Sequence, residues 1–481
     1  MTVYDKLKTG RPAIWIVLIA FVSGLVIVAQ NRLGTPEPNA ATPGDRPPNI
    51  IVYMVDTLRA REIGVYGADI TKTPSIDAFA AESMLFERAA SPAPSTRASI
   101  ASFLTGVSPA VHGVESGLHG LLAGTEALQR LPEILKNAGY RTAALVANPN
   151  IDPAFGFQRG FDVYERLYRL PEIQRPPSSL DLIYTAPAMV DEIRQFLENL
   201  PAEQPFFLFV LTIDPHGPYT PPPPYDAMYD QRGAGGEPGM MNNLLELDRQ
   251  LEAGQPADLD IPLALYRGEI SYGDLAFGEF MSWMKTNDWH KDTVVVFTAD
   301  HGEAFGEHGN RGHGKTIYQE TIHIPLIIRY PKYFAGGHRN PANVDLIDLS
   351  ATLVTLAGQN PPAYWTGRDL RDAIPDGAVF AMSHQPGYAS TSVIRGNYTF
   401  IENELDDSSE LFDLSADPGE QEPLDATRHQ ATMDEMRKKL AQFRDTSAAT
   451  RARMVNGQLD LRDEDVPAEI REQLESLGYI N

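Results

Sequence analysis

The sequence predicts an α/β fold: a mostly parallel central sheet with helices on both faces, followed by a small C-terminal subdomain with an antiparallel sheet. Short, uninterrupted apolar runs, which are typical of strands buried on both faces, alternate with longer amphipathic segments along most of the chain. Strands that are connected through helices run parallel, and the helices pack on the two faces of the sheet. After residue 376 the apolar runs shorten and are separated by Gly, Asn and Asp, which favours antiparallel hairpins.

The same patterns place the individual elements. Strands of the central sheet are expected at residues 49–55, 142–147, 206–213, 293–299 and 323–329. Helical periodicity predicts helices at residues 74–86, 96–106, 131–138, 180–200, 265–285 and 345–358. The small sheet should contain strands at residues 379–383, 391–395, 398–402 and 410–412, with helices after it at residues 426–445 and 469–477.

By composition the chain divides into four segments. Residues 1–30 form an N-terminal membrane anchor or signal segment, and residues 31–48 form a flexible linker rich in Pro, Gly, Ala and Thr. Residues 49–375 are expected to form the main α/β domain. Residues 376–481 are expected to form the C-terminal subdomain, with its small antiparallel sheet and terminal helices.

The N-terminal segment predicts where the rest of the chain resides. Lys6, Lys8 and Arg11 precede an uncharged apolar run at residues 13–30, which as a helix would be roughly 27 Å long, enough to span a bilayer. The positive flank would keep the N-terminus cytoplasmic. The alternative is a cleaved signal peptide, although Ile27 stands where such a cleavage site needs a small residue. Both interpretations place the rest of the chain outside the cytoplasm, in a periplasmic or extracellular location.

The composition excludes several classes of function. The chain has 481 residues, a formal net charge of −24 and no cysteine. The excess of negative charge argues against nucleic acid or an anionic membrane surface as a partner. The absence of cysteine excludes disulfides, thiolate nucleophiles and zinc–thiolate sites. An anionic substrate would therefore need a metal or local positive groups to attract it.

A short helix at residues 96–106 is the first candidate site. Pro92 and Pro94 enforce an extended approach, hydroxyl side chains stand at the helix start, and Gly106 is a typical C-terminal stop. Free backbone N–H groups and the helix dipole at such a terminus favour an alkoxide or a bound anion. The same pattern also occurs in an ordinary capped helix.

Acidic and histidine residues follow several of the predicted strands. Asp300 and His301 come directly after one buried strand, and Asp56 follows another. Ligands converge at this edge of α/β sheets, and mixed oxygen and nitrogen donors suit zinc, manganese or iron better than calcium or magnesium. His216 and His313 lie beside Pro or Gly near the same edge. The pattern therefore predicts a metal site.

Two segments are expected to be loops. Residues 219–225 are rich in proline, and residues 232–260 are rich in Gly, acidic residues and Met. Both follow the strand that ends near His216, so they could form a lid over a pocket. A surface insertion without a role is the alternative for the second segment.

Five motifs together resemble the sulfatase family within the alkaline-phosphatase superfamily. They occur in the family order and at family-like distances: Asp56-Thr57-Leu58-Arg59-Ala60, the helix at residues 96–106, Asp214-Pro215-His216-Gly217-Pro218-Tyr219, Thr298-Ala299-Asp300-His301-Gly302-Glu303 and His313-Gly314-Lys315-Thr316-Ile317-Tyr318-Gln319-Glu320. The resemblance covers residue 48 to the C-terminus. It implies that residues 49–375 are a sulfatase-like catalytic domain.

The nucleophile position departs from the sulfatase pattern. Sulfatases carry a Cys-x-Pro-Ser-Arg type motif, whose Cys or Ser becomes formylglycine, ten residues before the Gly that ends the helix. Counting back from Gly106 gives Thr96 at that position and Ile100 in place of the motif arginine. Threonine cannot yield the formylglycine aldehyde. A threonine here resembles the phosphodiesterase and phosphoethanolamine-transferase relatives of the superfamily.

The resemblance implies a metal-activated nucleophile. Asp56, Asp300, His301 and Thr96 would bind one divalent metal ion, with zinc or manganese favoured over calcium. Metal coordination would lower the pKa of the Thr96 hydroxyl and make the alkoxide available.

The resemblance also implies groups that contact the transferred anion. His216, His313 and Lys315 would bind it and act in catalysis, with one histidine protonating the leaving oxygen, and Asn148 would be a further substrate ligand. A second metal held by Asp214, His216 and His313 is the alternative to a single-metal site.

The expected function is an exported, metal-dependent sulfatase-family hydrolase that cleaves a sulfate or phosphate ester, a phosphodiester or a phosphonate through Thr96. The substrate would be an anionic ester of a small molecule, a glycan or a lipid head group. A membrane-anchored transferase of phosphoryl head groups and a non-catalytic anchored binding protein are the alternatives.

Overall fold

The computed structural model describes residues 46–115, 122, 125–169, 185–201, 204–233, 240–372, 374, 377–385, 387–455 and 466–476. The predicted anchor at residues 1–30 and most of the predicted linker lie outside this part. Residues from Arg46 onward form one compact unit. Among the helices of the described residues, none combines the length and the apolar character that a bilayer span requires.

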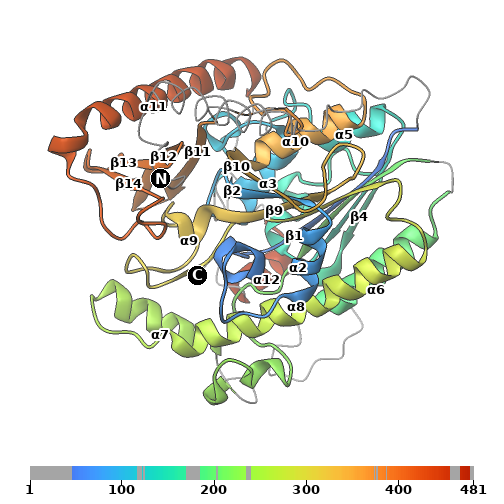
Figure 1. The fold of residues 1–481 in the computed structure, drawn as a ribbon, viewed down its shortest axis with the longest axis horizontal. Helices are drawn as coiled ribbons and strands as arrows, with labels where there is room; N and C mark the ends of the chain where they lie inside the picture. Colours follow the sequence, from blue (N-terminus) through green and yellow to red (C-terminus); the bar gives the residue numbers. More distant parts are fainter. Residues whose placement is uncertain are drawn as a thin grey trace, which may run out of the picture. The chain divides into compact units, whose positions relative to one another are not determined.

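The central sheet has eight strands (Figure 1). Five consecutive neighbours run parallel, in the order β6, β1, β5, β3, β4. β9 runs antiparallel to both of its neighbours, β6 and β2, and β10 pairs parallel to β2. The prediction of a mostly parallel sheet is therefore confirmed, and the strands are β1 (Asn49–Val55), β2 (Met84–Ala90), β3 (Arg141–Val146), β4 (Val163–Arg166), β5 (Phe206–Thr212), β6 (Thr293–Ala299), β9 (His323–Arg329) and β10 (His338–Asp345).

The three central strands explain why the candidate residues meet. Every residue of β1, β5 and β6 is buried, as their unbroken apolar sequences predict. In the parallel register Val55 pairs with Thr212 on one side and with Ala299 on the other. The next residue of β1 and the next residue of β6, Asp56 and Asp300, therefore lie side by side at one edge of the sheet.

Helices cover both faces of the sheet, as predicted. Figure 1 shows α3, α5 and α10 on one side and α2, α6 and α8 on the other. The α-helices of the described residues are α2 (Pro74–Ala81), α3 (Thr96–Thr105), α4 (Pro109–His112), α5 (Leu131–Asn137), α6 (Ala186–Glu198), α7 (Met240–Glu252), α8 (Asp260–Thr286), α9 (Gln319–Ile322), α10 (Leu346–Leu356), α11 (Ala426–Met454) and α12 (Ala468–Ser476). Single 3-10 turns lie at Ala60–Glu62, Gly64–Tyr66, Pro149–Ile151, Pro153–Phe155, Leu167–Arg169, Tyr225–Ala227 and Gln231–Gly233.

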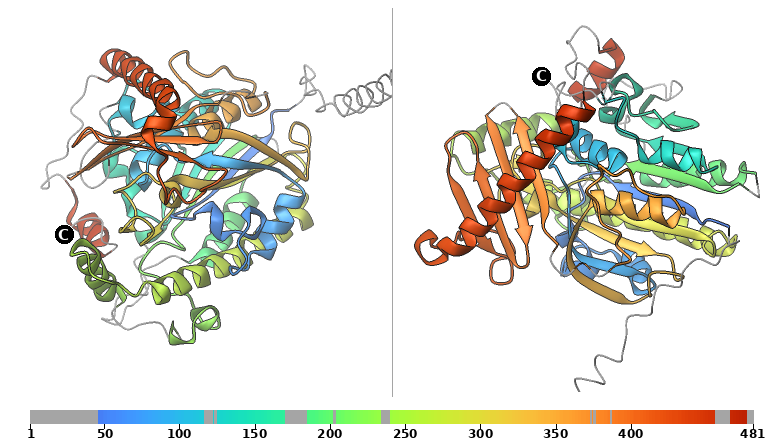
Figure 2. Two further views of the ribbon diagram at one scale, coloured as in Figure 1. Left: turned by 60° about the vertical axis from the view of Figure 1, so that its left-hand side comes forward. Right: turned by 90° about the horizontal axis from the view of Figure 1, so that it is seen from above.

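A separate four-stranded antiparallel sheet follows, as predicted for the C-terminal part. Its strands are β11 (Val379–Gln385), β12 (Tyr388–Arg395), β13 (Tyr398–Asn403) and β14 (Ser409–Asp413), paired in chain order. Figure 2 shows α11 lying across this sheet. Val393, Phe400 and Leu411 pack on Met436 and Leu440 of α11, so the helix buries one face of the sheet.

Two predictions about local structure were wrong, and several strands were not predicted. The expected helix at residues 74–86 ends at Ala81, and the chain continues into β2, because its apolar residues suit a buried strand as well as a helix. β10 was missed because its first half is polar and largely exposed, and β4 because it is a short, half-buried edge strand. The expected loop at residues 232–260 contains the 13-residue helix α7. A two-stranded ribbon of β7 (Ala304–Phe305) and β8 (Arg311–Gly312) precedes His313.

The end of α3 yields a test of the fold. Gly106 has a φ of 65°, and a Cβ atom at this position would collide with the indole ring of Trp365. We expect Gly106→Ala to lower the free energy of unfolding by about 3 kcal/mol, because strain and overpacking add. Chemical denaturation measures this. Gly139→Ala is the matched control, since Gly139 has a φ of 92° but open space around its Cα, and it should cost only about 1 kcal/mol. Equal losses for the two variants would contradict the packing at Gly106.

Candidate active site and metal centre

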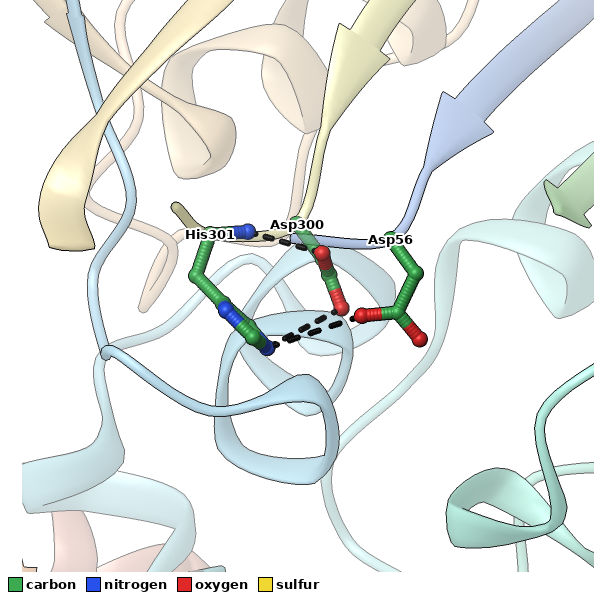
Figure 3. Close-up of side chains that lie close together, drawn as sticks. All are labelled: Asp56, Asp300 and His301. Atoms are coloured by element: carbon green, nitrogen blue, oxygen red, sulfur yellow. Dashed lines mark hydrogen bonds and ion pairs between the residues drawn. The ribbon is translucent and has the colours of Figure 1, made fainter. Parts of the chain in front are cut away.

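Asp56, Asp300 and His301 meet at the carboxyl ends of β1 and β6 (Figure 3). One ligand atom from each side chain lies within 4.8 Å of the others. His301 Nε2 is 3.8 Å from Asp56 Oδ1 and 3.5 Å from Asp300 Oδ2. All three side chains are fully buried. This is the group of three that the metal prediction required, and the ligand types are those expected for a transition metal.

The first residue of α3 completes the group. Thr96 is fully buried, and its Oγ1 lies 3.2 Å from His301 Nε2. One turn further along α3, Ser99 Oγ donates a hydrogen bond of 2.7 Å to the main-chain oxygen of Asp300. This bond ties the helix to the end of β6. The N-terminus of α3 therefore points at the same space as the two carboxylates, with Thr96 as the hydroxyl in contact with the centre.

The carboxylates of the centre carry uncompensated charge. Asp56 Oδ1 and Asp300 Oδ2 are buried and have no hydrogen-bond partner within the described chain. Burial, together with the nearby charge of Asp300, raises the pKa of Asp56 well above its usual range, and burial also raises the pKa of Asp300. Two neighbouring buried carboxylates without a counter-charge are strongly unfavourable. The residues present therefore fit a bound divalent cation.

His301 is oriented as a metal ligand. Its Nδ1 lies 2.9 Å from the main-chain oxygen of Gly302, so Nδ1 carries the proton and the lone pair of Nε2 faces Asp56 and Asp300. Burial lowers the pKa of His301 to about 4, so the ring is neutral at pH 7. A neutral imidazole with its lone pair aimed at two carboxylates is a donor arrangement that can bind a divalent metal ion.

Asn148 lies behind the centre, against Asp56. Its side-chain amide donates a short hydrogen bond to Asp56 Oδ2, and its Oδ1 accepts from the main-chain N–H of Asn150 at 2.8 Å. The main-chain N–H of Thr57 contacts Asp300 Oδ1 at 3.2 Å. The amide group predicted to bind substrate thus holds one of the carboxylates in place.

The two predicted catalytic histidines form a chain of rings with His301. The ring centroid of His313 is 4.5 Å from that of His301 and 5.0 Å from that of His216. Burial lowers the pKa of His216 to about 4 and that of His313 to about 3. Both are therefore neutral at pH 7 in the free protein. The structure thus brings His216 and His313 together beside the metal centre.

Two residues without a predicted role support the site. Glu303 is buried, and its Oε1 lies 3.0 Å from Nδ1 of His313. Arg97 is also buried, donates to Asn150 O at 3.1 Å and lies over the ring of Phe155. Arg97 therefore ties the start of α3 to the segment that carries Asn148. The only sequence signal for either residue was its place within a motif.

Helix α7 pairs with the loop that carries His313. Arg311 makes a hydrogen-bonded ion pair of 2.7 Å with Asp248, and Lys315 Nζ lies 3.4 Å from Glu252, one turn further along the helix. The side chain of Lys315 is 31 % exposed. The predicted anion ligand thus contacts an acidic side chain of the segment for which a lid and a surface insertion without a role were the two alternatives.

Asp214 is bound to the start of α6. Its Oδ2 accepts a hydrogen bond of 2.8 Å from the main-chain N–H of Ala186, the first residue of α6. Within the described chain, the group of three that could hold a metal ion is formed by Asp56, Asp300 and His301. The structure therefore does not gather Asp214, His216 and His313 into a second centre.

Strand β11 forms hydrogen bonds to the segment before Thr96 and to the loop after His313. The main-chain N–H of Met382 donates to Pro92 O at 3.1 Å, just before α3. Ser383 Oγ donates to Gly314 O at 2.7 Å, and the side-chain amide of Gln385 donates to the same oxygen. Gly314 N in turn donates to Pro94 O. The small sheet therefore fixes the approach to Thr96 relative to the residue after His313.

The charge of the centre predicts that Asp56→Asn raises the stability of the metal-free protein, although it removes a metal ligand. Because the pKa of Asp56 is raised on folding, its ionisation opposes folding, and the stability of metal-free protein falls as the pH rises through that raised pKa. We expect chelator-treated Asp56→Asn to melt about 2 °C or more above chelator-treated wild type at pH 8. With zinc or manganese present, wild type should melt higher than the variant. Calorimetry measures both. Exposed Asp406→Asn should change neither midpoint, and a destabilised metal-free Asp56→Asn would contradict the electrostatic description.

Comparisons with known proteins agree with this geometry. The model of the family described as Sulfatase matches residues 48–359, well over half of the chain. The model described as N-sulphoglucosamine sulphohydrolase, C-terminal, matches residues 306–446. The ulvan-active sulfatase of Formosa agariphila is 26% identical over 459 residues, covering 88% of this chain and 85% of the relative. The arylsulfatase of Clostridium perfringens is 25% identical over 383 residues, covering 68% and 79%.

Solved structures show the same fold. A protein in complex with its substrate D-glucosamine-2-N,6-O-disulfate has a TM-score of 0.68 at 19% identity, covering 84% of this chain and 99% of the other. The phosphonate monoester hydrolase of Silicibacter pomeroyi has a TM-score of 0.66 at 24% identity, covering 83% and 96%. The matched family model, the sheet order and the composition of the site lead to one conclusion: the chain belongs to the sulfatase family and is a sulfatase-like ester hydrolase.

Proposed function

We propose that this protein is an exported, metal-dependent hydrolase of phosphodiesters or phosphonate monoesters in which Thr96 is the nucleophile. The observation that carries the proposal is the position of Thr96 Oγ1, at the N-terminus of α3 and 3.2 Å from the nitrogen that faces Asp56 and Asp300. Threonine cannot form the formylglycine used by sulfatases, which is the reason to favour a phosphorus centre. The names of the relatives make sulfate esters the competing substrate class.

Asp56, Asp300, His301 and Thr96 would hold one divalent ion, zinc or manganese in preference to calcium, because one donor is an imidazole nitrogen. Such an ion would lower the pKa of the Thr96 hydroxyl and offset the charge that develops in the transition state. The unpaired oxygens of Asp56 and Asp300 support this proposal.

Thr96 Oγ1 would attack the phosphorus of the bound ester in line with the leaving oxygen, so that the new Thr96–O–P bond forms as the bond to the leaving group breaks. The backbone N–H groups at the start of α3 would stabilise negative charge on the other oxygens. Water would then attack the phosphorus and break the Thr96–O–P bond, which releases a phosphate monoester from a phosphodiester, or a phosphonate from a phosphonate monoester, and regenerates the Thr96 hydroxyl. The proton lost by Thr96 balances the proton gained by the leaving oxygen, and one water molecule is consumed, so no other co-reactant is required.

His313 is the better candidate to protonate the leaving oxygen. In the free protein its pKa of about 3 leaves it neutral. An anionic ester bound against the ring would raise that pKa, and Glu303, 3.0 Å from Nδ1, would stabilise the imidazolium. His216, whose Nδ1 faces the main-chain oxygen of Gly217, would bind the transferred group.

Thr96 variants test the proposal directly. Thr96→Ala should lower kcat/KM by at least about 10³-fold, whereas Thr96→Ser should stay within about tenfold of wild type, because it keeps the hydroxyl. The measurement is a parallel assay of a phosphodiester, a phosphonate monoester, a phosphate monoester and an aryl sulfate, each with manganese, zinc or calcium. We expect the phosphodiester or the phosphonate to react fastest, with manganese or zinc.

Ser95→Ala is the matched control, since Ser95 precedes the helix and makes no capping hydrogen bond with its side chain. It should leave the rates close to those of wild type. Full activity of Thr96→Ala would exclude the assigned nucleophile. Fastest turnover of the aryl sulfate with calcium would assign the protein to sulfate esters. Turnover that depends on an added alcohol acceptor would indicate a transferase.

We also propose that residues 13–30 anchor the protein in the membrane, with the catalytic part outside the cytoplasm. The uncharged apolar run and its positive flank support this. Full-length protein should therefore sediment with membranes. In sealed membrane vesicles whose outer surface is the non-cytoplasmic side, added protease should cleave the catalytic part. A chain that begins at residue 46 should remain in the supernatant. Recovery of the full-length protein in the supernatant with its N-terminus intact would contradict the anchor.

A further inference from the structure

His308 joins two parts of the fold outside the catalytic centre. Its Nδ1 lies 2.7 Å from Oε1 of Glu320, in the short helix α9, and its Nε2 lies 2.8 Å from the main-chain oxygen of Glu420. Glu420 follows β14, in the segment that leads from the small sheet to α11. Helix α9 and the small sheet also share an apolar cluster that contains Ile322 and Phe412. One imidazole ring therefore connects the turn between β7 and β8 with α9 and with the end of the small sheet.

Both ring nitrogens of His308 face hydrogen-bond acceptors. A neutral imidazole carries a proton on one nitrogen, so its other nitrogen would direct a lone pair at an acceptor oxygen. Turning the ring over would bring carbon atoms against these oxygens, well inside the roughly 3.3 Å of a C–H···O contact. The amide nitrogen of Gln421 lies 3.3 Å from Nε2, further away than Glu420 O, and donates to Gly419 O at 2.9 Å. The geometry therefore fits an imidazolium ion with a proton on each nitrogen.

The surroundings of the ring favour a positive charge. The ring of Tyr318 is stacked on that of His308, with the centroids 3.6 Å apart and the planes inclined by 6°. The hydroxyl of Tyr318 donates to Glu410 Oε2 at 2.7 Å. Burial lowers the pKa of His308, but the hydrogen bonds to Glu320 and Glu420 outweigh burial and raise that pKa above its ordinary value.

Most of the charged groups near His308 are acidic. The preceding residue, Glu307, forms ion pairs with Arg59 and Arg61. Burial raises the pKa of Glu420 to about 7, so this carboxyl group also changes its charge near neutral pH. Within the part of the chain that the structure describes, the charged and titratable groups that face His308 or pair with its neighbours are Arg59, Arg61, Glu307, Tyr318, Glu320, Glu410 and Glu420.

Glu420 contacts α9 and His308 through different groups. It is 1 % exposed and has a φ of 55°. Its Oε2 accepts a hydrogen bond of 2.9 Å from the main-chain N–H of Gln319, the first residue of α9, while its main-chain oxygen faces His308. Helix α9 in turn contacts the catalytic centre, because Gly302 N donates to Thr321 O at 2.8 Å. These contacts connect the small sheet, through α9, with the turn at the end of β6.

We propose that His308, as an imidazolium ion, stabilises the docking of the small sheet on α9, and that this contact weakens as the pH rises. Loss of the proton would leave a lone pair facing an acceptor oxygen and would remove the ion pair with Glu320. Because folding raises the pKa of His308, its contribution to stability is fully present below the unfolded pKa of about 6.5 and is lost as the pH rises through the folded pKa.

This behaviour is separate from the catalytic centre. The pKa values of His216, His301 and His313 are about 3 to 4 in the free protein, so these rings do not titrate above pH 6. The proposal therefore does not depend on the proposed reaction.

The protonation state of His308 can be observed directly. In full-length protein with ¹⁵N-labelled histidine rings, the signals that disappear in His308→Gln identify His308 among the 11 histidines. At pH 6 both ring nitrogens should show the chemical shifts of an imidazolium ion. They should change to those of a neutral ring only above a pH of about 6.5. A neutral ring at pH 6 would overturn the proposal.

Calorimetry and hydrogen exchange measure the effect on docking. His308→Gln should lower the melting temperature by about 2 °C or more at pH 6 and by much less at pH 9. Amide exchange in α9 and around Glu420, corrected for its intrinsic pH dependence, should be faster at pH 9 than at pH 6 in wild type. In the variant it should be equally fast at both. Equal losses of melting temperature at the two pH values would indicate packing alone and would overturn the pH dependence.

Two further variants serve as controls. Glu420→Gln removes the second titrating group but keeps the main-chain oxygen that faces His308. The pH-dependent effect of His308→Gln should persist in this background, and its disappearance would assign the titration to Glu420 instead. His338→Gln is the matched control, because His338 is an exposed histidine whose Nδ1 lies 3.0 Å from the main-chain oxygen of Gly336. It should change neither measurement. These readouts do not involve turnover, so their failure would leave the assignment of Thr96 unaffected.

Discussion

The site depends on two neighbouring carboxylates, those of Asp56 and Asp300, that are buried away from water. The parallel pairing of Val55 with Ala299 forces Asp56 and Asp300 to be neighbours, and burial prevents them from turning to solvent. Folding therefore places two negative charges side by side where a bound cation would stabilise them. Neighbouring groups orient the two carboxylates. Asn148 and a backbone N–H donate to one oxygen of each, and the Nε2 lone pair of His301 faces the other oxygen of each.

The region around this centre is closely balanced in charge. Arg311 and Lys315 flank His313, but they form ion pairs with Asp248 and Glu252 of α7. In a chain with a net charge of −24, these basic residues supply little free attraction for an anion. The capture of an anionic ester would thus rest mainly on a bound cation and on the backbone at the start of α3. The contact with Glu252 reduces the positive charge that Lys315 offers to an anion.

Much of the fold and the centre could be predicted because both depend on local sequence. Unbroken apolar strands such as β1 and β6 can only be buried, and residues that directly follow them share one edge of the sheet. The position of Thr96 followed from the resemblance to the sulfatase motif, which places the nucleophile ten residues before Gly106. Contacts between distant segments could not be predicted. Nothing near Glu303 in the sequence indicates that it would contact His313. Asp214 accepts a hydrogen bond from the N-terminus of α6, which is distant in sequence. The polar strand β10 was missed because it is stabilised by its neighbour rather than by its own sequence.

The position of β11 has a consequence for how the protein matures. Residues 382 and 383 form hydrogen bonds to the main chain at Pro92 and Gly314, so two segments more than two hundred residues apart in sequence meet on one later strand. During synthesis the loops beside Thr96 and His313 leave the ribosome long before this strand exists. Their final geometry can form only after the small sheet has been made and has docked. A chain that lacks the small sheet would lack the hydrogen bonds that fix the segments beside Thr96 and His313.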